Sequence, residues 1–472
     1  MRLSDLRGLL RGDMAHVHRV LGDTGQRGPL RRALAWLRRR SEASGAHAIA
    51  LPACPPLALL WAWHEGGHEQ SPAVVVHRAF LGEAWRERGG LARTGALLRL
   101  ALLWLPVNLT LAAWASALHA RAVARRTGKG LLRQLAEQLS VLCAHDIRAV
   151  NYYGYELFDD ARRARARDYL QRSEMKGGVY LLMKRFLPAS SKLANKLRFA
   201  ERCSARGIRT IPLLAVAERG ELRLLRGDAL PRADLFVKPN DGRGGVGADW
   251  WAWDAGALAF RNSSGQTIAE RDFPAHVAKL SESERYLVSP RLVPHSALTD
   301  LSEGVLSTVR IVTVLNERGE PEATDAVFRM STGANRIVDN FHAGGLAAQV
   351  DLETGALARA TDIGLRPDVG WRELHPNGAP ITGRRLPFWP DAVELCRRAH
   401  AAFADRVAIG WDVALLDDGP CLVEGNGGPD LDIHQRCSGV PVGATRLGEL
   451  LALHTRRALA ARAEREGSFR SG

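Results

Sequence analysis

The residues best suited to chemistry lie near the end of the chain, in the segment I-G-W-D-V-A-L-L-D-D-G-P-C-L-V-E-G-N. Two apolar runs flank a turn at residues 417–419, which predicts a β-hairpin. Folding about residue 418 places Asp412 opposite Glu424, and Asn426 shares their face because side chains alternate along a strand. Two carboxylates facing each other about 5 Å apart repel, and a divalent cation between them removes the repulsion. Because all three side chains offer oxygen ligands, we expect a magnesium site; the alternative is an exposed acidic hairpin edge.

A second candidate site is the glycine-rich loop in F-V-K-P-N-D-G-R-G-G-V-G, between two predicted strands. Its glycines are Gly242, Gly244, Gly245 and Gly247. Glycines let the backbone approach oxygen atoms closely and point its N–H groups at a phosphate. The loop is not a Walker loop, because no G-K-[ST] opens a helix after it. The alternative interpretation is a plain flexible hairpin loop.

Lysines are scarce in this chain, with seven beside 58 arginines, so each deserves a separate look. Lys238 ends the strand before the glycine loop. Lys196 falls on a helix that we predict from an N-cap at Ser190 or Ser191 to a stop at Gly207. A lysine ammonium is a compact charge suited to one or two phosphate oxygens. We therefore expect these two lysines to converge on phosphate.

The elements that must position these residues alternate between helices and strands beyond residue 150. Helices are predicted over 131–149 and 161–173. Strands are predicted at 208–216, 234–239, 249–253, 285–289, 306–315, 322–330, 345–351, 408–416 and 420–426, with further turns at 316–319 and 352–355. Mixed antiparallel sheets with helices packed on them follow from this order, so the class is α+β or mixed α/β.

Composition and charge narrow the function classes. With 46% hydrophobic and 25% charged residues, the 472-residue chain is typical of a globular protein. Its six scattered cysteines form no C-x-x-C pair, which favours a reducing, cytoplasmic location over a zinc ribbon or a secreted disulfide scaffold. Residues 1–150 hold 21 Arg and Lys against 10 Asp and Glu, hence +11 of the net +14. No nucleic-acid-binding motif accompanies this charge, so we expect no nucleic-acid partner and favour an anionic membrane surface.

Residues 100–118 form an uncharged run that carries Trp104 and Trp114. The run is almost long enough to span a membrane, but Pro106 and Asn108 lie near its centre. Two interpretations stay open: peripheral membrane contact through residues 1–130, or a helix buried in the protein core.

The order and spacing of the candidate residues resemble an ATP-grasp domain. The matching residues are Lys196 in N-K-L-R, Lys238 in F-V-K-P, Arg310 in S-T-V-R-I-V-T-V, and the final Asp412, Glu424 and Asn426. More narrowly, V-D-N-F-H-A-G-G at 338–345, the following V-D-L-E-T-G, and the hairpin resemble the sugar-transfer-associated ATP-grasp group, which is related to alpha-L-glutamate ligases. The resemblance covers roughly residues 150–450.

This resemblance implies an ATP-grasp fold of class α+β, in which two subdomains clamp ATP between antiparallel sheets, with a mostly helical N-terminal appendage. The expected parts are a helical, basic and apolar region (1–150), the N-terminal part of the ATP-grasp module (151–232), a glycine-loop lid (233–295), and a C-terminal core with the metal hairpin and a terminal helix (296–472).

The resemblance also implies roles for single residues. Lys196 and Lys238 would contact ATP phosphates under the glycine loop. The backbone near Leu287 and Val288 would read the adenine edge, although Ser289–Pro290 stands where the group commonly has Gln or Glu. Arg310 would stabilise the transferring phosphoryl group or an acyl phosphate; its alternative is a structural ion pair. A substrate or phosphate loop would contain Asn340, His342, Gly344 and Gly345.

The implied function is an ATP- and Mg²⁺-dependent ligase that joins a carboxylate to an amine or thiol through an acyl phosphate. Its small-molecule substrates would include an amino sugar, a saccharide precursor or an amino acid, in saccharide, natural-product or cell-envelope biosynthesis. The alternatives are an ATP-grasp phosphotransferase that stops at phosphorylation, and a nucleotide-binding accessory module at a membrane. The sequence does not specify the oligomeric state.

Overall fold

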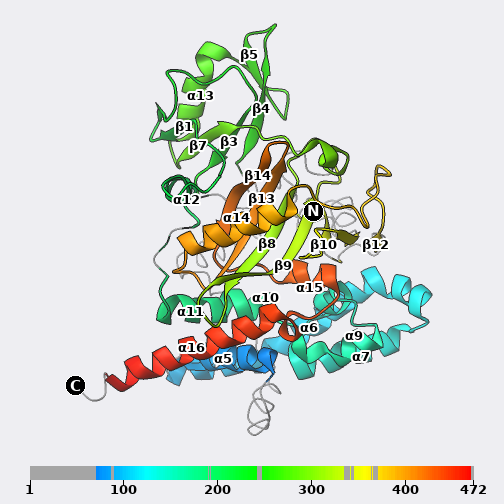
Figure 1. The fold of residues 1–472 in the computed structure, drawn as a ribbon. Coiled ribbons are helices and arrows are strands. Elements are labelled where there is room, and N and C mark those ends of the chain that lie inside the picture. Colours follow the sequence, from blue (N-terminus) through cyan, green and yellow to red (C-terminus); the bar gives the residue numbers. More distant parts are fainter. Residues whose placement is uncertain are drawn as a thin grey trace, which may run out of the picture. The chain divides into compact units, whose positions relative to one another are not determined.

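The computed structural model describes residues 71–86, 90–189, 191, 193–241, 247–333, 341, 345–362, 364 and 370–468, and these form two compact units (Figure 1). Unit 1 comprises the described residues up to Leu187, those of Asp362–Gly370, and those from Asp430 onward. Unit 2 comprises those of Pro188–Thr361 and Trp371–Pro429. The division differs from the predicted boundary at residue 150, because the helices up to Leu187 and the C-terminal helix share one unit.

Unit 1 is helical. Its elements are α5 (Pro72–Arg86), α6 (Gly90–Thr127), α7 (Leu131–His145), α8 (Ala149–Gly154), α9 (Asp160–Ala164), the 3-10 turn η1 (Ala166–Asp168), α10 (Arg172–Glu174), the π-turn η2 (Met175–Val179), α11 (Tyr180–Phe186), α15 (Asp432–Ser438), η6 (Val442–Ala444) and α16 (Arg446–Ser468). The C-terminal α16 packs along α5 and α11, and an ion pair joins Arg462 to Glu83. The predicted helix over 161–173 is instead broken into short turns.

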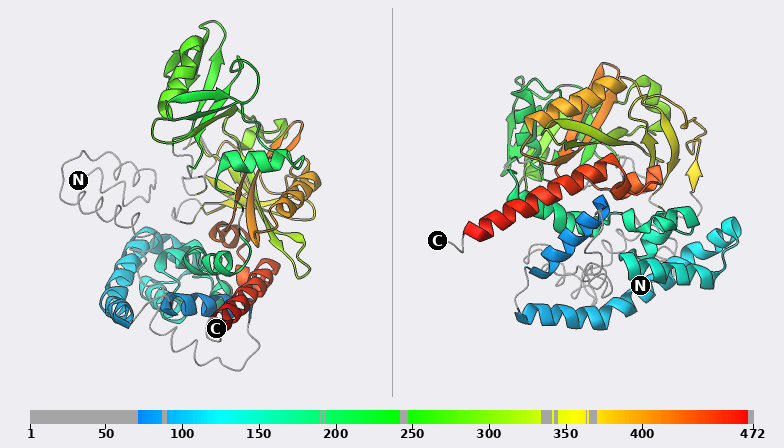
Figure 2. Two further views of the ribbon diagram at one scale, coloured as in Figure 1. Left: turned by 90° about the vertical axis from the view of Figure 1, so that its left-hand side faces the viewer. Right: turned by 60° about the horizontal axis from the view of Figure 1, so that its bottom comes forward.

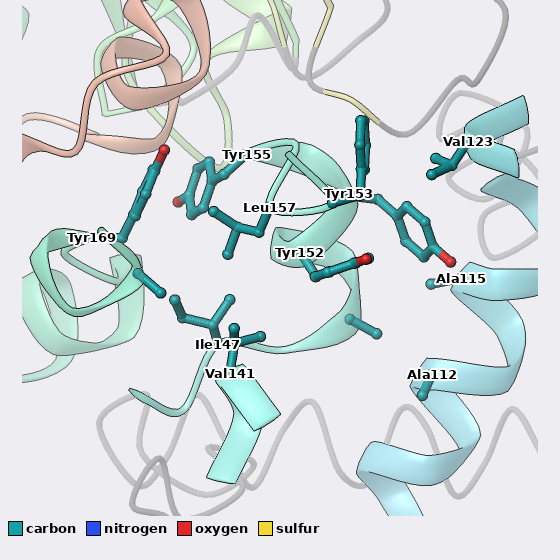
Figure 3. Close-up of a cluster of buried hydrophobic side chains, with 13 residues drawn as sticks. Ala112, Ala115, Val123, Val141, Ile147, Tyr152, Tyr153, Tyr155, Leu157 and Tyr169 are labelled. Carbon is teal, nitrogen blue, oxygen red and sulfur yellow. The ribbon is translucent and has the colours of Figure 1, made fainter. Parts of the chain in front are cut away.

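The core of unit 1 is rich in tyrosine. Five of the six tyrosines of the chain lie between residues 152 and 180. Figure 3 shows Tyr152, Tyr153, Tyr155 and Tyr169 gathered with aliphatic side chains of α6 and α7. Tyr155 stacks on Tyr169 with ring centroids 4.8 Å apart. Buried tyrosine hydroxyls usually find hydrogen-bond partners, and the Tyr152 hydroxyl donates to Glu137 at 2.8 Å.

Unit 2 contains two seven-stranded antiparallel sheets. The lid sheet has the order β2-β1-β7-β3-β4-β5-β6. Its strands are β1 (Ala215–Glu218), β2 (Glu221–Leu224), β3 (Leu235–Pro239), β4 (Asp249–Asp254), β5 (Ala259–Asn262), β6 (Thr267–Ala269) and β7 (Tyr286–Pro290), accompanied by η3 (Glu270–Asp272) and α13 (Phe273–Leu280). Phe273 and Val277 of α13 pack on one face of this sheet against Trp251 and Phe260.

The second, core sheet of unit 2 has the order β12-β11-β10-β9-β8-β13-β14. Its strands are β8 (Thr308–Leu315), β9 (Pro321–Met330), β10 (Leu346–Val350), β11 (Leu357–Thr361), β12 (Trp371–Arg372), β13 (Ala408–Leu416) and β14 (Gly419–Asn426); α12 (Lys196–Ser204), η4 (Ser296–Leu301) and α14 (Trp389–Ala402) complete the unit. In Figure 1, α14 lies across β8, β9, β13 and β14, and its contacts with all four strands agree. One face of the sheet is thereby buried.

The predicted strands and turns that form the core sheet are confirmed. The turns at 316–319, 352–355 and 417–419 lie between paired strands, and the sheets are antiparallel as expected. Asn316 illustrates the turn chemistry, because its side-chain oxygen accepts from the backbone N–H groups of Arg318 and Glu320. The lid strands DLFVKP and DWWAW appear as β3 and β4, whereas the predicted strand 208–216 begins only at Ala215.

Candidate active site

The β13–β14 hairpin places Asp412 opposite Glu424, but by a different route from the one predicted. Near the turn, Leu416 pairs with Gly419 and Val413 with Leu422, so the hairpin is centred half a residue before Asp418. That register alone would put Val423 opposite Asp412. A one-residue bulge between Val413 and Asp412 shifts the register and brings Glu424 there instead. The bulge therefore decides which side chain of β14 meets Asp412.

Two glycines in this hairpin make room for large side chains. A Cβ atom at Gly425 would lie 2.9 Å from the ring of Trp411, which is paired with it. A Cβ atom at Gly410 would lie 3.2 Å from Cδ of Arg310. The glycines in I-G-W-D and E-G-N thus let the buried tryptophan and the arginine stem lie against the backbone.

The face of the core sheet opposite α14 carries polar side chains across five neighbouring strands. The ladder registers put them on one face, since Asp412 pairs with Arg310, Arg310 with Val327, and Val327 with Gln349. The members of this polar face are Gln349 (β10), Asp325 and Arg329 (β9), Thr308 and Arg310 (β8), Asp412 (β13), and Glu424 and Asn426 (β14).

Asp412 is the electrostatic centre of the polar face. Arg310 donates to both of its carboxylate oxygens, from Nε to Oδ1 and from Nη2 to Oδ2 at 3.0 Å. Arg329 adds a second guanidinium, 3.1 Å from Oδ2. Burial works to raise the pKa of Asp412, but the two arginines outweigh it and hold that pKa well below its usual range. Asp412 is therefore ionised at neutral pH.

These ion pairs change the electrostatic argument for a metal. The repulsion between Asp412 and Glu424 is already reduced by Arg310 and Arg329, so a cation is not needed on that ground alone. Among the described residues no group of three His, Cys, Asp or Glu side chains could hold a metal ion. The predicted ligand set contains only two such residues, Asp412 and Glu424, together with Asn426.

The donor set nevertheless fits magnesium in its chemistry. Asn426 Nδ2 donates to Glu424 Oε1 at 3.1 Å, which places the amide beside the carboxylate on the same edge strand. Asp412, Glu424 and Asn426 present only oxygen ligands, and Mg²⁺ binds through one or two carboxylates and takes its remaining ligands from water and phosphate. Their role as ligands stays a prediction.

Asn240 brings the two predicted phosphate lysines together. It follows β3, is fully buried, and accepts on its side-chain oxygen from the N–H of Leu197 at 3.1 Å. Its backbone carbonyl accepts from Lys196 Nζ, also at 3.1 Å. The first turn of α12 is thus tied to the end of β3, two residues beyond Lys238. The true N-cap is Asn195, not Ser190 or Ser191, so Lys196 is the first residue of the helix.

The actual cap has a clear cause. The Asn195 side chain accepts from the N–H of Arg198 at 3.0 Å, as an N-cap does. Ser191 is engaged elsewhere, because its hydroxyl accepts from Arg406 Nε at 3.1 Å and its N–H donates to Asp405. Ser190 lies outside the described residues.

The Lys238 ammonium lies in an environment that favours its deprotonated form. Burial lowers the pKa of its ammonium to about 8; Glu424 opposes the shift and Lys196 adds to it. Glu424 and Lys196 are therefore the two charges that act most on the Lys238 ammonium. A phosphate chain near both lysines would restore the full positive charge of Lys238.

The glycine loop is described only at its end. Gly242, Gly244 and Gly245 lie outside the described residues. Gly247 has φ of 75°. A Cβ atom there would lie 2.9 Å from the Pro239 ring and 3.2 Å from the Tyr286 hydroxyl. Both the conformation and the close approach require glycine at this position.

The predicted adenine contacts at Leu287 and Val288 lie on β7, which is an inner strand of the lid sheet. It is hydrogen-bonded to β1 on one side and β3 on the other, and the Val288 carbonyl accepts from Leu214 N–H at 2.8 Å. The backbone hydrogen-bonding groups of β7 are therefore engaged with the neighbouring strands of the sheet. Leu287 pairs with Lys238, so its side chain shares the Lys238 face, whereas Val288 belongs to the core under α13. Leu287 could form the apolar floor of a nucleotide site.

The predicted substrate loop is largely beyond what the structure describes. Asn340, His342 and Gly344 lie outside the described residues. Gly345 directly precedes β10 and is buried, and the neighbouring Phe341 is also buried. The roles of these four residues stay predictions.

Sequence reasoning missed Arg329, Asp325 and Gln349. Arg329 is bonded to Thr308 as well as to Asp412, and Gln349 Nε2 donates to Asp325 Oδ1 at 3.1 Å. The sequence contains a signal that could have identified Arg329. This arginine interrupts the apolar run A-V-F-R-M, just as Arg310 interrupts S-T-V-R-I-V. A charge inside a buried strand deserved the same weight in both places.

Comparison with known proteins points to one family. The family model described as "Sugar-transfer associated ATP-grasp" matches residues 187–442, a little over half of the chain. No curated protein sequence matches significantly.

Similar solved structures include two ligases. D-alanine–D-alanine ligase from Bacillus anthracis is 12% identical, with a TM-score of 0.33, and the match covers 58% of this chain and 69% of that one. An L-amino acid ligase from Bacillus licheniformis is 11% identical, with a TM-score of 0.32 and coverage of 56% and 48%. The family match, and not these distant similarities, carries the assignment.

Proposed function

The chain belongs to the sugar-transfer associated ATP-grasp family, and we propose that it is an ATP-dependent ligase that joins a carboxylate to an amine or thiol. The observation that carries the proposal is the meeting of opposite charges in unit 2. Lys196 and Lys238 lie near the end of β3, within reach of the charge of Glu424 on the polar face of the core sheet. This grouping of two ammonium groups with carboxylate and amide oxygens supports the proposal.

The proposed reaction needs charge stabilisation more than an enzyme nucleophile. A substrate carboxylate oxygen attacks the γ-phosphorus of ATP, the bond to the β–γ bridging oxygen breaks, and ADP leaves. The amine then attacks the acyl phosphate, loses a proton, and phosphate departs. Negative charge develops on oxygen in both steps, so fixed cations lower the barriers.

Each residue has a proposed part in this scheme. Lys196 and Lys238 hold the phosphate chain, and Asp412, Glu424 and Asn426 would hold Mg²⁺. When bound, Mg²⁺ neutralises charge on the phosphate oxygens. Arg310 and Arg329 both bind Asp412, so they fix its orientation; Arg310, in this proposal, also presents positive charge to the transferred phosphoryl group.

The substrates are proposed only by class. The words "sugar-transfer associated" in the family description support a place in saccharide chemistry. The reactants that we propose are a small carboxylate and an amino sugar or amino acid. Two structurally similar proteins are named as ligases of D-alanine and of L-amino acids, which agrees with such substrates without identifying them.

A screen of carboxylic acids crossed with amines tests the proposal, with ADP release as the readout and mass spectrometry of the products. We expect ADP release only when a carboxylate is present, and an amide when the amine is added. Hydroxylamine in place of the amine should trap the acyl phosphate as a hydroxamate. A stable phosphorylated product without amide would instead assign a phosphotransferase. ATP binding without turnover of any pair would favour a nucleotide-binding module.

A further inference from the structure

The polar face of the core sheet continues beyond Arg310 onto β9 and β10. Figure 2 shows α14 along one side of this sheet, and the polar face is the opposite side. Arg310 pairs with Val327 of β9, and Val327 pairs with Gln349 of β10. Asp325 lies two residues from Val327 and therefore shares its face. Asp325 and Gln349 thus extend the polar face on the side of Arg310 that is away from the β13–β14 hairpin.

These two side chains are bonded to each other. Gln349 Nε2 donates to Asp325 Oδ1 at 3.1 Å. This bond also fixes the orientation of the amide, because a reversed amide would put two acceptor oxygens against each other. The carbonyl oxygen of the amide, Gln349 Oε1, is therefore turned away from Asp325.

Gln349 Oε1 is buried and has no hydrogen-bond donor among the described residues. A buried carbonyl oxygen without a donor is costly, and in native proteins a water molecule or a ligand usually supplies one. Asp325 is 7% exposed and adds a carboxylate beside this oxygen. The pair therefore offers acceptor oxygens and negative charge to a group that carries hydrogen-bond donors.

The two arginines of the polar face direct their donors elsewhere. Arg310 donates to Asp412, and Arg329 bonds to Thr308 and Asp412. Thr308 and Asp412 belong to β8 and β13, whereas Gln349 belongs to β10, on the other side of β9. The carbonyl of Gln349 is thus left for a different donor.

The Asp325–Gln349 pair lies at a suitable distance from Arg310 to hold a second substrate. Arg310 and Asp325 are diagonal neighbours on adjacent strands, so their Cα atoms lie about 7–8 Å apart. Gln349 is two strands from Arg310, which corresponds to about 10 Å. In the proposed function the transferred phosphoryl group lies at Arg310, with the predicted metal ligands on one side of it. A small acceptor held by the pair on the other side would reach an acyl phosphate there.

We propose that Asp325 and Gln349 bind the amino group of the acceptor substrate. This inference rests on the proposed ligase function and narrows it. An amino or ammonium group brings two or three N–H donors to these oxygens, whereas a thiol brings one weak donor. The acceptor is then an amine, such as an amino sugar or an amino acid, and not a thiol.

Residues 100–118 also bear on the acceptor, because a membrane-bound acceptor would require a membrane contact. They belong to helix α6 of unit 1, which packs against α7 and α8, with Trp104 beside Leu142 and Trp114 on the tyrosine-rich core. These contacts agree with the buried-helix interpretation of this run. No helix among the described residues is long and apolar enough to cross a bilayer, and peripheral membrane contact stays a prediction.

Binding of simple amines tests the pair without turnover. Saturation-transfer NMR of the full chain, with magnesium and ADP present, would use glucosamine, ethanolamine and glycinamide as probes. Each amine is compared with a neutral counterpart in which a hydroxyl replaces the amino group, namely glucose, ethylene glycol and glycolamide. In the wild type we expect a larger signal from at least one amine than from its counterpart. Asp325→Asn should abolish that excess, because the carboxylate charge is lost while the shape is kept.

Steady-state kinetics tests the same pair during turnover, with an acid and an amine from the screen described above. Asp325→Asn and Gln349→Met should each raise the KM for the amine by about ten- to a hundredfold, and the KM for ATP should change far less. Hydroxylamine, which is largely uncharged at neutral pH, should still trap the acyl phosphate in both variants.

A matched control is available on the other side of the core sheet. Asp391→Asn makes the same chemical change at an exposed position of α14 and should keep the wild-type KM values and the amine signal.

Amine signals and amine KM values that are equal in the wild type and Asp325→Asn would overturn the inference, as would a preference for 2-mercaptoethanol over every amine as acceptor. A lower thermal midpoint without a change in either amine measurement would show that the pair is structural and that water is its donor. Absence of ADP release with every acid, together with an amine signal that Asp325→Asn abolishes, would refute the ligase function and keep the amine site.

Discussion

Each unit buries a carboxylate among arginines, yet the two arrangements differ in what lies beside them. In unit 1, Glu156 meets Arg126 at 2.8 Å, Arg162 at 3.1 Å and Arg436 at 3.6 Å. Arg436 also donates to the carbonyls of Gly154 and Asp362, so the cluster ties backbone segments together.

In unit 2, Asp412 is equally buried and paired with Arg310 and Arg329, but a second carboxylate lies opposite it. Glu424 has no cation within ion-pair distance in the described part of the chain, and its neighbour Asn426 contributes only an amide. The surplus carboxylate and the nearby Lys238 distinguish this cluster. A buried arginine–carboxylate pair by itself indicates a structural role. Further ionisable groups beside such a pair, with no counter-charge of their own, indicate a candidate binding or catalytic site.

The largest effect should come from Glu424→Gln. Removing the surplus carboxylate should reduce Mg²⁺-dependent ADP formation by about a thousandfold, because a metal site supplies several kcal/mol of charge stabilisation. The thermal midpoint should barely change, since Glu424 is not part of an ion pair. Turnover at the wild-type rate with unaltered Mg²⁺ dependence would show that Glu424 is not a ligand. Asp412→Asn should lose activity too, but it also leaves two arginines uncompensated.

Glu156→Gln should give the reverse pattern. Three arginines would lose their buried counter-charge, which we expect to lower the free energy of unfolding of unit 1 by about 3 kcal/mol. The rate of ADP formation per folded molecule should stay the same. Urea unfolding followed by circular dichroism, with Glu424→Gln as the control, measures the contrast. Equal stability of Glu156→Gln and wild type would mean that this cluster is not structural.

Lys238→Met should raise the KM for ATP by about ten- to a hundredfold, because a hydrogen bond to a charged group is lost while the stem is kept. In the wild type, ATP affinity should fall as pH rises through about 8, where the ammonium of free Lys238 loses its proton. The variant should lack that step. Lys279→Met, which removes an exposed lysine of α13, is the control and should keep the wild-type KM.

The last prediction concerns the pH response of Asp146, at the end of α7 in unit 1. Burial raises the pKa of its carboxyl to about 7. A raised folded-state pKa means that its contribution to stability is fully present below pH 3.8 and is lost as pH rises through 7. Asp412 responds in the opposite direction: its lowered pKa keeps its contribution at neutral pH and loses it only on acidification.

Asp146→Asn therefore tests the pH response of unit 1. Asparagine tolerates the left-handed conformation there (φ 54°) and carries no charge. The variant should match the wild type near pH 4 and exceed it by up to about 4 kcal/mol near pH 8, the amount to which about three pKa units correspond. Because burial lowers the pKa of the adjacent His145 to about 4, which acts oppositely, the difference between variant and wild type is the quantity to measure. A difference that does not grow with pH would contradict the raised pKa.

The sequence predicted several local features of unit 2, which contains the candidate active site. The fold class, the antiparallel strands from 306 onward and the hairpin turns were predicted, because strand alternation and turn residues act over a few positions. The facing of Asp412 and Glu424 was predicted as well, although the bulge between Val413 and Asp412 was not. A bulge adjusts the register through cross-strand packing, which a single strand does not reveal.

The sequence by itself determined that the chain has an ATP-grasp module, which hairpin carries its acids, and where its scarce lysines lie. Only the tertiary structure decided which partners these residues have. Asp412 gains Arg310 and Arg329 from strands some 80 to 100 residues earlier, and Asn240 joins Lys196 to the end of β3. Contacts between distant segments depend on how whole elements pack, and that is not written in the local order of residues.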